Sequence, residues 1–322
     1  MHSRAPSGRR IRPATARARP TEAMTLDLTI AQFKPSKGNV EGTLAAVVDT
    51  LVRATGGEHA PPSVVAFPET ALTGYFLEGG VRERALAADE LFDRLAAGYA
   101  GAAERPVEVA LGFYELDAGH VYNSALYARL GPEPALLHVH RKVFLPTYGV
   151  FQEERFVESG PGVEAFDTAV GRVALLICED AFHTVSGTLA ALDGAELILV
   201  LSASPARGAS PGAGVPGNLA RWDLLGSGLA AEHGVFVVVS QLVGFEGGKG
   251  FPGGSAAYSP RGERIATGPL WEEALVPVRL DRSEIRQART EEPLFADLER
   301  SWTRLLVNSP GSGVGRPRPE AS

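Results

Sequence analysis

Three polar side chains capable of covalent chemistry each stand where an apolar run of this 322-residue sequence ends. Cys178, the only cysteine, follows the run VALLI, and Glu69 follows VVAFP, in which Pro68 interrupts the run. Lys142 follows the basic residues His140 and Arg141 and precedes a loop that contains proline and glycine. A thiol, a carboxylate and an ammonium group placed together can act as nucleophile, base and electrophile. The sequence therefore predicts a site of nucleophilic catalysis.

Each of these residues also has an ordinary structural interpretation. A lone cysteine is often a small buried hydrophobic residue, and glutamate and lysine are usually solvated surface charges. A single cysteine cannot form an intramolecular disulfide, which makes a nucleophilic role worth testing. All three residues are expected at strand ends, where open α/β sheets present their catalytic groups. This shared position favours the catalytic interpretation.

The hydrophobic pattern predicts the strands and helices that would position these residues. Short apolar runs indicate strands, and apolar residues at helical spacing indicate helices. The expected strands are 26–33, 64–67, 107–114, 121–130, 135–140, 171–178, 197–201, 235–241, 255–259, 264–267 and 274–280. The expected helices are 39–53, 83–100, 184–192, 218–233 and 294–307. The order β-α-β-α-β-β-β then occurs twice, which two mixed sheets packed face to face, with helices outside, would satisfy.

Six segments between residues 24 and 279 carry a resemblance to a known family. They are PETALTGY (68–75), VYNSALY (121–127), KVFLPTYGVFQEERF (142–156), LLICED (175–180), SASP (202–205) and GGSAAYSPRGERIATGPLWEEALV (253–276). In this order they resemble the carbon–nitrogen hydrolase (nitrilase) superfamily. More narrowly, they are similar to the glutaminase domain of glutamine-dependent NAD synthetases.

The resemblance implies a fold and a set of site residues. The expected fold is the four-layer αββα sandwich of that superfamily. The implied catalytic residues are Glu69, Lys142 and Cys178, with Glu153 as a supporting carboxylate that orients the lysine. The resemblance also implies a substrate pocket with these lining residues: Tyr75, Tyr148, Glu179, Phe182 and Ser204. No metal and no cofactor is expected.

The predicted activity is that of an amidase, which hydrolyses a small linear amide to a carboxylic acid and ammonia through a thioester. A glutamine-like ω-amide is the favoured substrate. Two departures from the family pattern leave the specificity open: Gln152 stands where aspartate is usual, and Phe182-His183 stands where tryptophan is common. Hydrolysis of N-carbamoyl compounds or nitriles uses the same residues and stays an alternative.

Two further alternatives differ in class. The chain could be a glutaminase subunit that supplies ammonia to a separate synthetase, or a non-catalytic binding module. The SGGxDS signature of an ATP pyrophosphatase domain is absent from the sequence, so we expect the hydrolase domain without a synthetase domain. The complete set of glutamate, lysine and cysteine argues against a binding module.

Other motifs fit a ligand site less well. The glycine-rich segment 244–254 lacks the G-K-[ST] ending of a phosphate-binding loop and precedes an expected strand, so it predicts a hairpin or rim loop. His138 and His140 could share a metal, but no third ligand is near in the sequence, and we interpret them as surface histidines of one strand. The absence of a G-x-S-x-G motif argues against a serine hydrolase.

Composition narrows the partners and the domain organisation. The net charge of −7 argues against nucleic acid, and no run approaches the length of a membrane helix. We therefore expect a cytoplasmic protein, and the family resemblance implies a homo-oligomer, a dimer or larger. Residues 1–23, with six arginines and three prolines, and the Pro/Gly/Ser-rich residues 309–322 are expected to be disordered tails around a hydrolase domain at 24–308.

Overall fold

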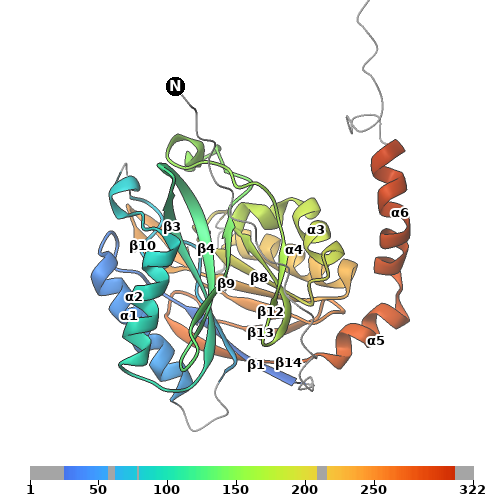
Figure 1. Ribbon diagram of the computed structural model, residues 1–322. Coiled ribbons are helices and arrows are strands. Elements are labelled where there is room, and N and C mark those ends of the chain that lie inside the picture. The colour runs from blue at the N-terminus through green and yellow to red at the C-terminus, as the bar shows by residue number, and fades with distance from the viewer. Residues whose placement is uncertain (1–24, 57–61, 78–79, 209–215, 309–322) are drawn as a thin grey trace, which may run out of the picture.

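Two six-stranded sheets pack face to face in the part of the chain that the structure describes (Figure 1). The structure is a computed structural model, and it describes residues 25–56, 62–77, 80–208 and 216–308. The predicted tails, 1–23 and 309–322, lie outside the described residues.

The two sheets have the same internal plan. The first has the order β14-β1-β2-β3-β4-β5, with β1 (Thr25–Gln32), β2 (Val64–Ala66), β3 (Val107–Asp117), β4 (His120–Leu130), β5 (Ala135–Arg141) and β14 (Ala274–Asp281). The second has the order β13-β12-β9-β8-β7-β6, with β6 (Ala165–Thr168), β7 (Gly171–Ile177), β8 (Leu197–Ser202), β9 (Phe236–Gln241), β12 (Ala256–Tyr258) and β13 (Arg264–Thr267). In each sheet three parallel strands are followed by two antiparallel ones. The predicted duplication of element order is thus present in the topology.

The helices lie outside the two sheets (Figure 1). They are α1 (Val40–Thr55), α2 (Ala88–Ala100), α3 (Thr184–Leu192), α4 (Gly217–His233), α5 (Ser283–Glu291) and α6 (Leu294–Asn308). The pair α1 and α2 lies against the first sheet, and α3 and α4 lie against the second. Short 3₁₀ turns are η1 (Arg82–Arg84), η2 (Glu153–Arg155) and η3 (Cys178–Phe182).

The side chains of one sheet contribute to two apolar layers, one on each face of the sheet. On β2, Val64 and Ala66 belong to the cluster between the sheets, whereas Val65 and Phe67 belong to the cluster with α1 and α2. Successive side chains of a strand point to opposite faces, so a strand buried on both faces reads as a continuous apolar run. The predicted αββα sandwich is confirmed.

One predicted helix is shorter than expected. Residues 83–100 carry helical spacing, but the regular helix begins at Ala88, after η1 and an extended stretch. In that stretch the Leu86 N–H donates to the Tyr114 carbonyl, and the Leu86 carbonyl accepts from Leu116. This pairing with β3 is a long-range contact that local spacing does not reveal. The strand β6 and the helix α5 were not predicted.

The glycine-rich segment forms the expected hairpin. Strands β10 (Val243–Glu246) and β11 (Lys249–Pro252) pair antiparallel. The turn between them places Gly247 and Gly248 at φ values of 54° and 75°, which glycine adopts without a steric cost. The segment is therefore a hairpin rather than a phosphate-binding loop.

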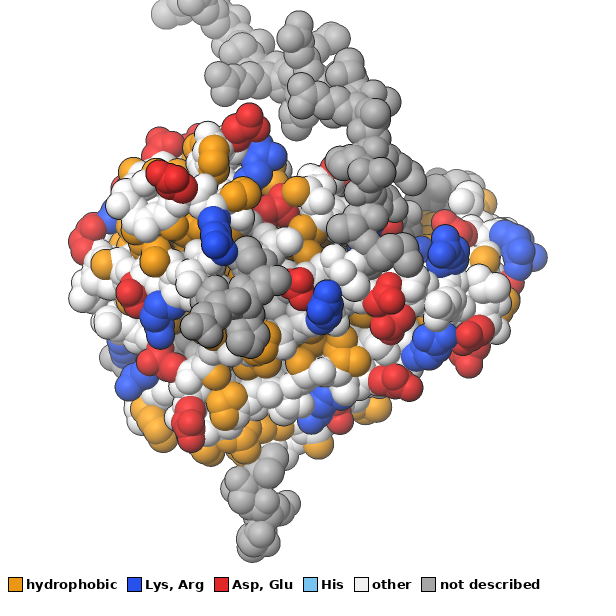
Figure 2. All heavy atoms as spheres, turned by 90° about the horizontal axis from the view of Figure 1, so that it is seen from below, with side chains coloured by type: hydrophobic (Ala, Val, Ile, Leu, Met, Phe, Trp, Pro, Cys, Tyr) orange, Lys and Arg blue, Asp and Glu red, His pale blue; other side chains and the backbone are white. Residues whose placement is uncertain are grey.

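The surface is mixed in charge on the face that Figure 2 draws, where acidic and basic side chains are interspersed. On the opposite side of the body from α1, the last helix, α6, stands away from the sheets (Figure 1). Of its residues only Phe295 is buried. Within the described ranges, no helix combines the length and the apolar character that crossing a membrane requires.

Gly112 is predicted to be essential for the turn that follows β2. A Cβ atom on Gly112 would lie 2.4 Å from the Pro68 carbonyl oxygen and 2.5 Å from the Thr70 nitrogen, both backbone atoms. Gly112→Ala should therefore lower the free energy of unfolding in urea by about 1–3 kcal/mol, or more, because backbone must move. Gly162→Ala is the matched control, since a Cβ there meets nothing within 4 Å. Equal stability of the two variants would contradict the prediction.

Candidate active site

Lys142 is the centre of the site, completely buried between two carboxylates. Its Nζ donates to Glu69 Oε1 at 2.8 Å and to Glu153 Oε1 at 2.7 Å, and its side chain is 0% exposed. Burial alone lowers the pKa of a lysine, but Glu153 and Glu69 outweigh burial, and the pKa of Lys142 is raised well above its ordinary value. The side chain is thus held as an ammonium. The structure brings three of the predicted residues into direct contact.

Cys178 enters the same site from the second sheet. It directly follows β7 and begins η3, and its Sγ accepts a hydrogen bond from Ser202 Oγ at 3.6 Å. Its φ of 45° is a left-handed backbone conformation, which is uncommon for a residue with a Cβ. Thr70, directly after Glu69, has a φ of 48°. Strained residues at two converging strand ends are typical of functional sites.

The surroundings of Cys178 favour its neutral thiol form. Burial raises the pKa of Cys178, the charge of Glu69 raises it further, and Lys142 lowers it, with the net pKa well above that of a free cysteine. The thiolate charge in turn raises the pKa of Lys142, so the two groups lie within electrostatic reach. If the sulfur acts as a nucleophile, a base must therefore accept the thiol proton.

Glu69 is held by donors from three different elements. Its Oε1 accepts from Asn123 Nδ2 at 2.8 Å as well as from Lys142, and its Oε2 accepts from the Ala203 N–H at 2.7 Å. Asn123 lies on β4, and Ala203 follows β8. Neither residue was predicted as a site residue, although Asn123 is part of the VYNSALY segment. Three donors fix the orientation of the carboxylate before any ligand binds.

Glu153 has a second polar partner besides Lys142, the hydroxyl group of Tyr75. The Tyr75 hydroxyl donates to Glu153 Oε1, and burial raises the pKa of Glu153 to about 7, although Lys142 lowers it. Tyr75 is itself positioned by Glu246, whose Oε2 accepts from the backbone N–H groups of Tyr75 and Phe76 at 2.8 and 3.0 Å. Glu246 was not predicted as a site residue. Tyr75 and Lys142 thus share one acceptor atom, Glu153 Oε1.

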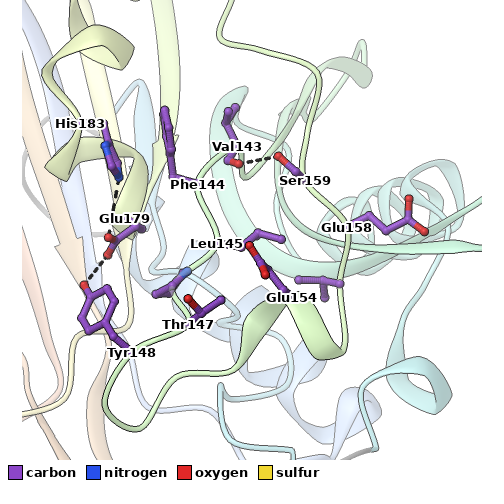
Figure 3. Close-up of a pocket in the computed structure, with 12 residues that line it drawn as sticks. Val143, Phe144, Leu145, Thr147, Tyr148, Glu154, Glu158, Ser159, Glu179 and His183 are labelled. Carbon is purple, nitrogen blue, oxygen red and sulfur yellow. Dashed lines mark hydrogen bonds and ion pairs between the residues drawn. The ribbon is translucent and has the colours of Figure 1, made fainter.

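An open pocket of about 760 Å³ is lined by Glu179, the residue that follows Cys178 (Figure 3). Tyr148 and Glu179 line it, and the Tyr148 hydroxyl donates to Glu179 Oε2 at 2.8 Å. Its lining residues are Val143, Phe144, Leu145, Pro146, Thr147, Tyr148, Glu154, Val157, Glu158, Ser159, Glu179 and His183. The pocket therefore combines an aromatic wall with several carboxylates.

Like Tyr75, two further predicted pocket residues lie outside this pocket. The Phe182 ring packs edge-on against Trp222 of α4, with ring centroids 4.9 Å apart. Ser204 is buried, and its hydroxyl accepts from Asn218 Nδ2 at 3.1 Å. Neither residue lines the pocket of Figure 3. Their predicted contact with substrate remains untested.

Asp180 joins the turn at Cys178 to the loop after Lys142. Its Oδ1 accepts from the N–H groups of Val143 and Phe144, each at 3.0 Å. Its Oδ2 accepts from the Ile177 N–H at 3.0 Å and contacts His140 Nε2 at 2.9 Å. Burial raises the pKa of Asp180, but His140 and the backbone donors outweigh it, and the net pKa is lowered.

The interpretation of the two histidines as surface residues was wrong. His140 is 2% exposed, because the buried Asp180 carboxylate provides its partner inside the protein. His138 is half-buried and stacks on Phe166, with centroids 4.3 Å apart, and burial lowers the pKa of His138 to about 4. In the described part of the chain, no group of three His, Cys, Asp or Glu side chains is arranged to hold a metal ion.

Comparisons with known proteins agree with the motif resemblance. The family model described as carbon-nitrogen hydrolase matches residues 27–290. Glutamine-dependent NAD(+) synthetase from Thermotoga maritima is 33% identical over 264 residues, which cover 80% of this chain and 42% of that protein. The chain thus spans less than half the length of the curated relatives it matches first. The similarity predicted from the six segments is confirmed.

Solved structures share the fold. A carbon-nitrogen hydrolase from Helicobacter pylori G27 is 22% identical with a TM-score of 0.75, over 88% of this chain and 99% of that one. A Glu-to-Gln mutant of the amidase from Nesterenkonia sp. AN1 is 21% identical with a TM-score of 0.67, over 89% and 100% of the two chains. Its description reports covalent addition of the acetamide moiety of fluoroacetamide at the active-site cysteine of that amidase.

Asp180→Asn is predicted to destabilise the protein by about 3–5 kcal/mol at pH 7, because an amide cannot accept from all the donors that the buried carboxylate satisfies. The folded pKa of Asp180 is below its ordinary value of 3.8. Its contribution is therefore present above about pH 4 and is lost as the pH falls through the folded pKa. Urea unfolding should be measured at several pH values. The difference in free energy of unfolding between Asp180→Asn and wild type should become smaller at low pH.

The control is Asp49→Asn, which removes an exposed ion pair with Arg53. An exposed pair contributes at most about 1 kcal/mol, so this variant should resemble wild type. If Asp180→Asn lowers the free energy of unfolding no more than the control does, a positioning role for Asp180 is contradicted.

Proposed function

The chain belongs to the carbon-nitrogen hydrolase family, and from that premise we propose that it is a cysteine-dependent amidase. Its substrate would be a small linear amide, preferably a glutamine-like ω-amide, which it would convert to a carboxylic acid and ammonia. The observation that carries the proposal is the buried Lys142 ammonium, which contacts Glu69 and Glu153 and lies within electrostatic reach of Cys178.

The first half of the proposed reaction forms a thioester. Glu69 accepts the proton of the Cys178 thiol, and the sulfur attacks the amide carbon. The resulting oxyanion is stabilised by the Lys142 ammonium and the backbone N–H that follows Cys178, at about 3–4 kcal/mol per donor. The C–N bond then breaks, and Glu69 returns its proton to the departing amine, which leaves as ammonia.

The second half releases the acid. Glu69 removes a proton from a water molecule, and the resulting hydroxide attacks the thioester carbon. The C–S bond breaks, the carboxylic acid departs, and the sulfur regains the proton from Glu69. Donors that hold the Glu69 carboxylate in one orientation support its use as base in both halves.

A glutaminase that supplies ammonia to a separate synthetase is a second candidate. It is supported by the similarity to glutamine-dependent NAD(+) synthetases, of which this chain spans less than half. Ammonia release should then be low for the chain alone and rise when a synthetase is added. The homo-oligomeric state and the cytoplasmic location remain predictions.

The proposal is tested first by a substrate screen. Ammonia release should be measured with glutamine, asparagine, other ω-amides, N-carbamoyl amino acids and nitriles. We expect the highest kcat/KM for an ω-amide. Turnover confined to N-carbamoyl compounds or nitriles would replace the amidase assignment and leave the proposed catalytic residues unchanged.

Cys178→Ala should lower kcat by at least about 10⁴-fold, because the proposed nucleophile is removed. Its melting temperature should stay near that of wild type. Iodoacetamide should add one group to the wild-type chain by mass spectrometry, and none to the variant, since Cys178 is the only cysteine. Substantial ammonia release by a pure sample of the variant would exclude the thioester route.

Lys142→Arg should be nearly as damaging as Lys142→Ala, each with a loss in kcat of about 100- to 1000-fold. A guanidinium keeps the charge, but it is larger and planar and does not fit a completely buried position between two carboxylates. Lys249→Arg, at a lysine above the Phe76 ring, is the matched control and should retain activity. Near-normal kcat for Lys142→Arg would mean that only the charge of the residue matters.

A further inference from the structure

Glu246 is a buried carboxylate that the hairpin of β10 and β11 brings to the edge of the site. It is 5% exposed, and its Oε2 accepts from the backbone N–H groups of Tyr75 and Phe76. Its Oε1 is buried and has no hydrogen-bond partner in the described part of the chain. Burying a carboxylate with one unpaired oxygen costs stability, so stability alone does not account for a charge at this position.

The backbone around Tyr75 is built to receive this carboxylate. Gly74, which precedes it, has a φ of 79°, and a Cβ atom there would lie 2.8 Å from Glu246 Oε1. The Tyr75 carbonyl is held separately, since it accepts from the Tyr114 hydroxyl at 3.1 Å. The N–H and the carbonyl of Tyr75 are therefore each bonded to a side chain, one on the hairpin and one on β3.

The hairpin that carries Glu246 is itself anchored to the site. The Gly250 carbonyl accepts from the N–H of Ala206, in the loop after β8, at 2.8 Å. The Phe251 ring packs on Phe76, with ring centroids 5.8 Å apart. These contacts fix the place at which the Glu246 carboxylate meets the segment of Tyr75.

The hydroxyl of Tyr75 connects this segment to Glu153. It donates to Glu153 Oε1, the atom that also accepts from Lys142 Nζ at 2.7 Å. Burial raises the pKa of Glu153 to about 7, whereas the hydrogen bonds from Lys142 and Tyr75 lower it. The bond from Tyr75 therefore contributes to the protonation state of this carboxyl group near neutral pH.

We propose that Glu246 is a positioning residue for amide hydrolysis, which acts through Tyr75 on Glu153. Its two charge-assisted hydrogen bonds hold the backbone of residues 75 and 76, and the Tyr75 hydroxyl is thereby kept on Glu153 Oε1. Loss of these bonds would free the hydroxyl, and Glu153 would then hold its proton to higher pH. The inference rests on the proposed function and adds to it a residue of the hairpin.

Charged and titratable groups from several elements face these two carboxyl groups. Around Glu153 they are Lys142, Glu69, Tyr75, Tyr114 and Cys178, and near Glu246 they are Lys37 and Tyr114. If a Glu246 variant acted only by removing negative charge, it would lower the pKa of Glu153. If it freed the Tyr75 hydroxyl, it would raise that pKa, because the carboxylate would lose a donor. The two explanations therefore predict shifts of opposite sign.

Glu246→Ala removes the charge and the acceptor, and Glu246→Gln restores a neutral acceptor of the same shape. In wild type the pH profile of kcat/KM should have an inflection near pH 7, where Glu153 titrates. Glu246→Ala should move this inflection to higher pH by about 0.5–1 pH unit, as for the loss of one hydrogen bond. Glu246→Gln should move it in the same direction by less, and it carries the test if Glu246→Ala does not fold.

The matched control is Glu108→Gln. Glu108 is another buried carboxylate, 3% exposed, which accepts from the Ala169 N–H at 3.0 Å and from the Tyr127 hydroxyl at 2.8 Å. These partners belong to the residue after β6 and to β4. The control should leave the inflection where it is in wild type.

Tyr75→Phe tests the route, because it removes the hydroxyl and should itself move the inflection to higher pH. If Glu246 acts through this hydroxyl, Glu246→Gln added to Tyr75→Phe should cause no further upward shift, since coupled residues are not additive. Additive upward shifts overturn the inference, and so does a downward shift, or no shift, in the single Glu246 variants. Each of these outcomes leaves the amidase proposal intact.

Absence of ammonia release from any amide by the wild-type chain overturns the proposed function instead. The link from Glu246 to Glu153 is then tested on the rate of Cys178 alkylation by iodoacetamide, measured against pH by mass spectrometry. Burial and Glu69 raise the pKa of Cys178, and the charge of Glu153 raises it as well, so this rate responds to the titration of Glu153. An upward shift of the rate profile in Glu246→Gln but not in Glu108→Gln supports the link, and no shift, or a downward one, rejects it.

Discussion

The completely buried ammonium of Lys142 is the interaction on which the rest of the site depends. Moving a charged group from water into the protein interior costs several kcal/mol. Oppositely charged partners offset this cost only when they lie at hydrogen-bonding distance and the remaining polar atoms also have hydrogen bonds. Glu69 and Glu153 supply the opposite charges at 2.8 and 2.7 Å. These carboxylates are buried too, so they need donors of their own, which are Asn123, the Ala203 N–H and the Tyr75 hydroxyl. The polar network thus extends outward from a single charge, and among its buried atoms Glu153 Oε2 and Asn123 Oδ1 have no hydrogen-bond partner in the described part of the chain.

The sandwich provides this network because its two sheets meet face to face. Lys142 follows β5 and Glu69 follows β2 on the first sheet, whereas Cys178 follows β7 and Ala203 follows β8 on the second. Neither sheet alone contains both the carboxylate and the thiol. Gly112 and Asp180 also help to position the site residues. Gly112 leaves space for the turn at Glu69, and Asp180 hydrogen-bonds the turn at Cys178 to the loop after Lys142. The fold therefore positions the site through contacts between distant segments.

That reliance on distant contacts explains which features could be predicted from the sequence. Strand ends and the residues that follow them are local properties, and the sequence placed Glu69, Lys142 and Cys178 there. Local spacing could not reveal that Leu86 pairs with β3, nor that β14 joins the first sheet beside β1. It could not show that His140 is buried against Asp180. Those features arise when residues separated by 28 positions or more meet, and no pattern within one segment carries that information.

The charges of the site also explain why its thiol need not be ionised at rest. Lys142 and Glu69 together are neutral, and burial raises the pKa of Glu153 to about 7, so the centre holds little net charge. A thiolate would add a buried negative charge close to Glu69, which is why the pKa of Cys178 lies well above that of a free cysteine. In the proposed mechanism, proton transfer to Glu69 at the moment of attack would avoid this state, because the negative charge would pass from the carboxylate to the substrate oxygen beside Lys142. In such a site the lysine acts less on the resting thiol than on the charge that develops during the reaction.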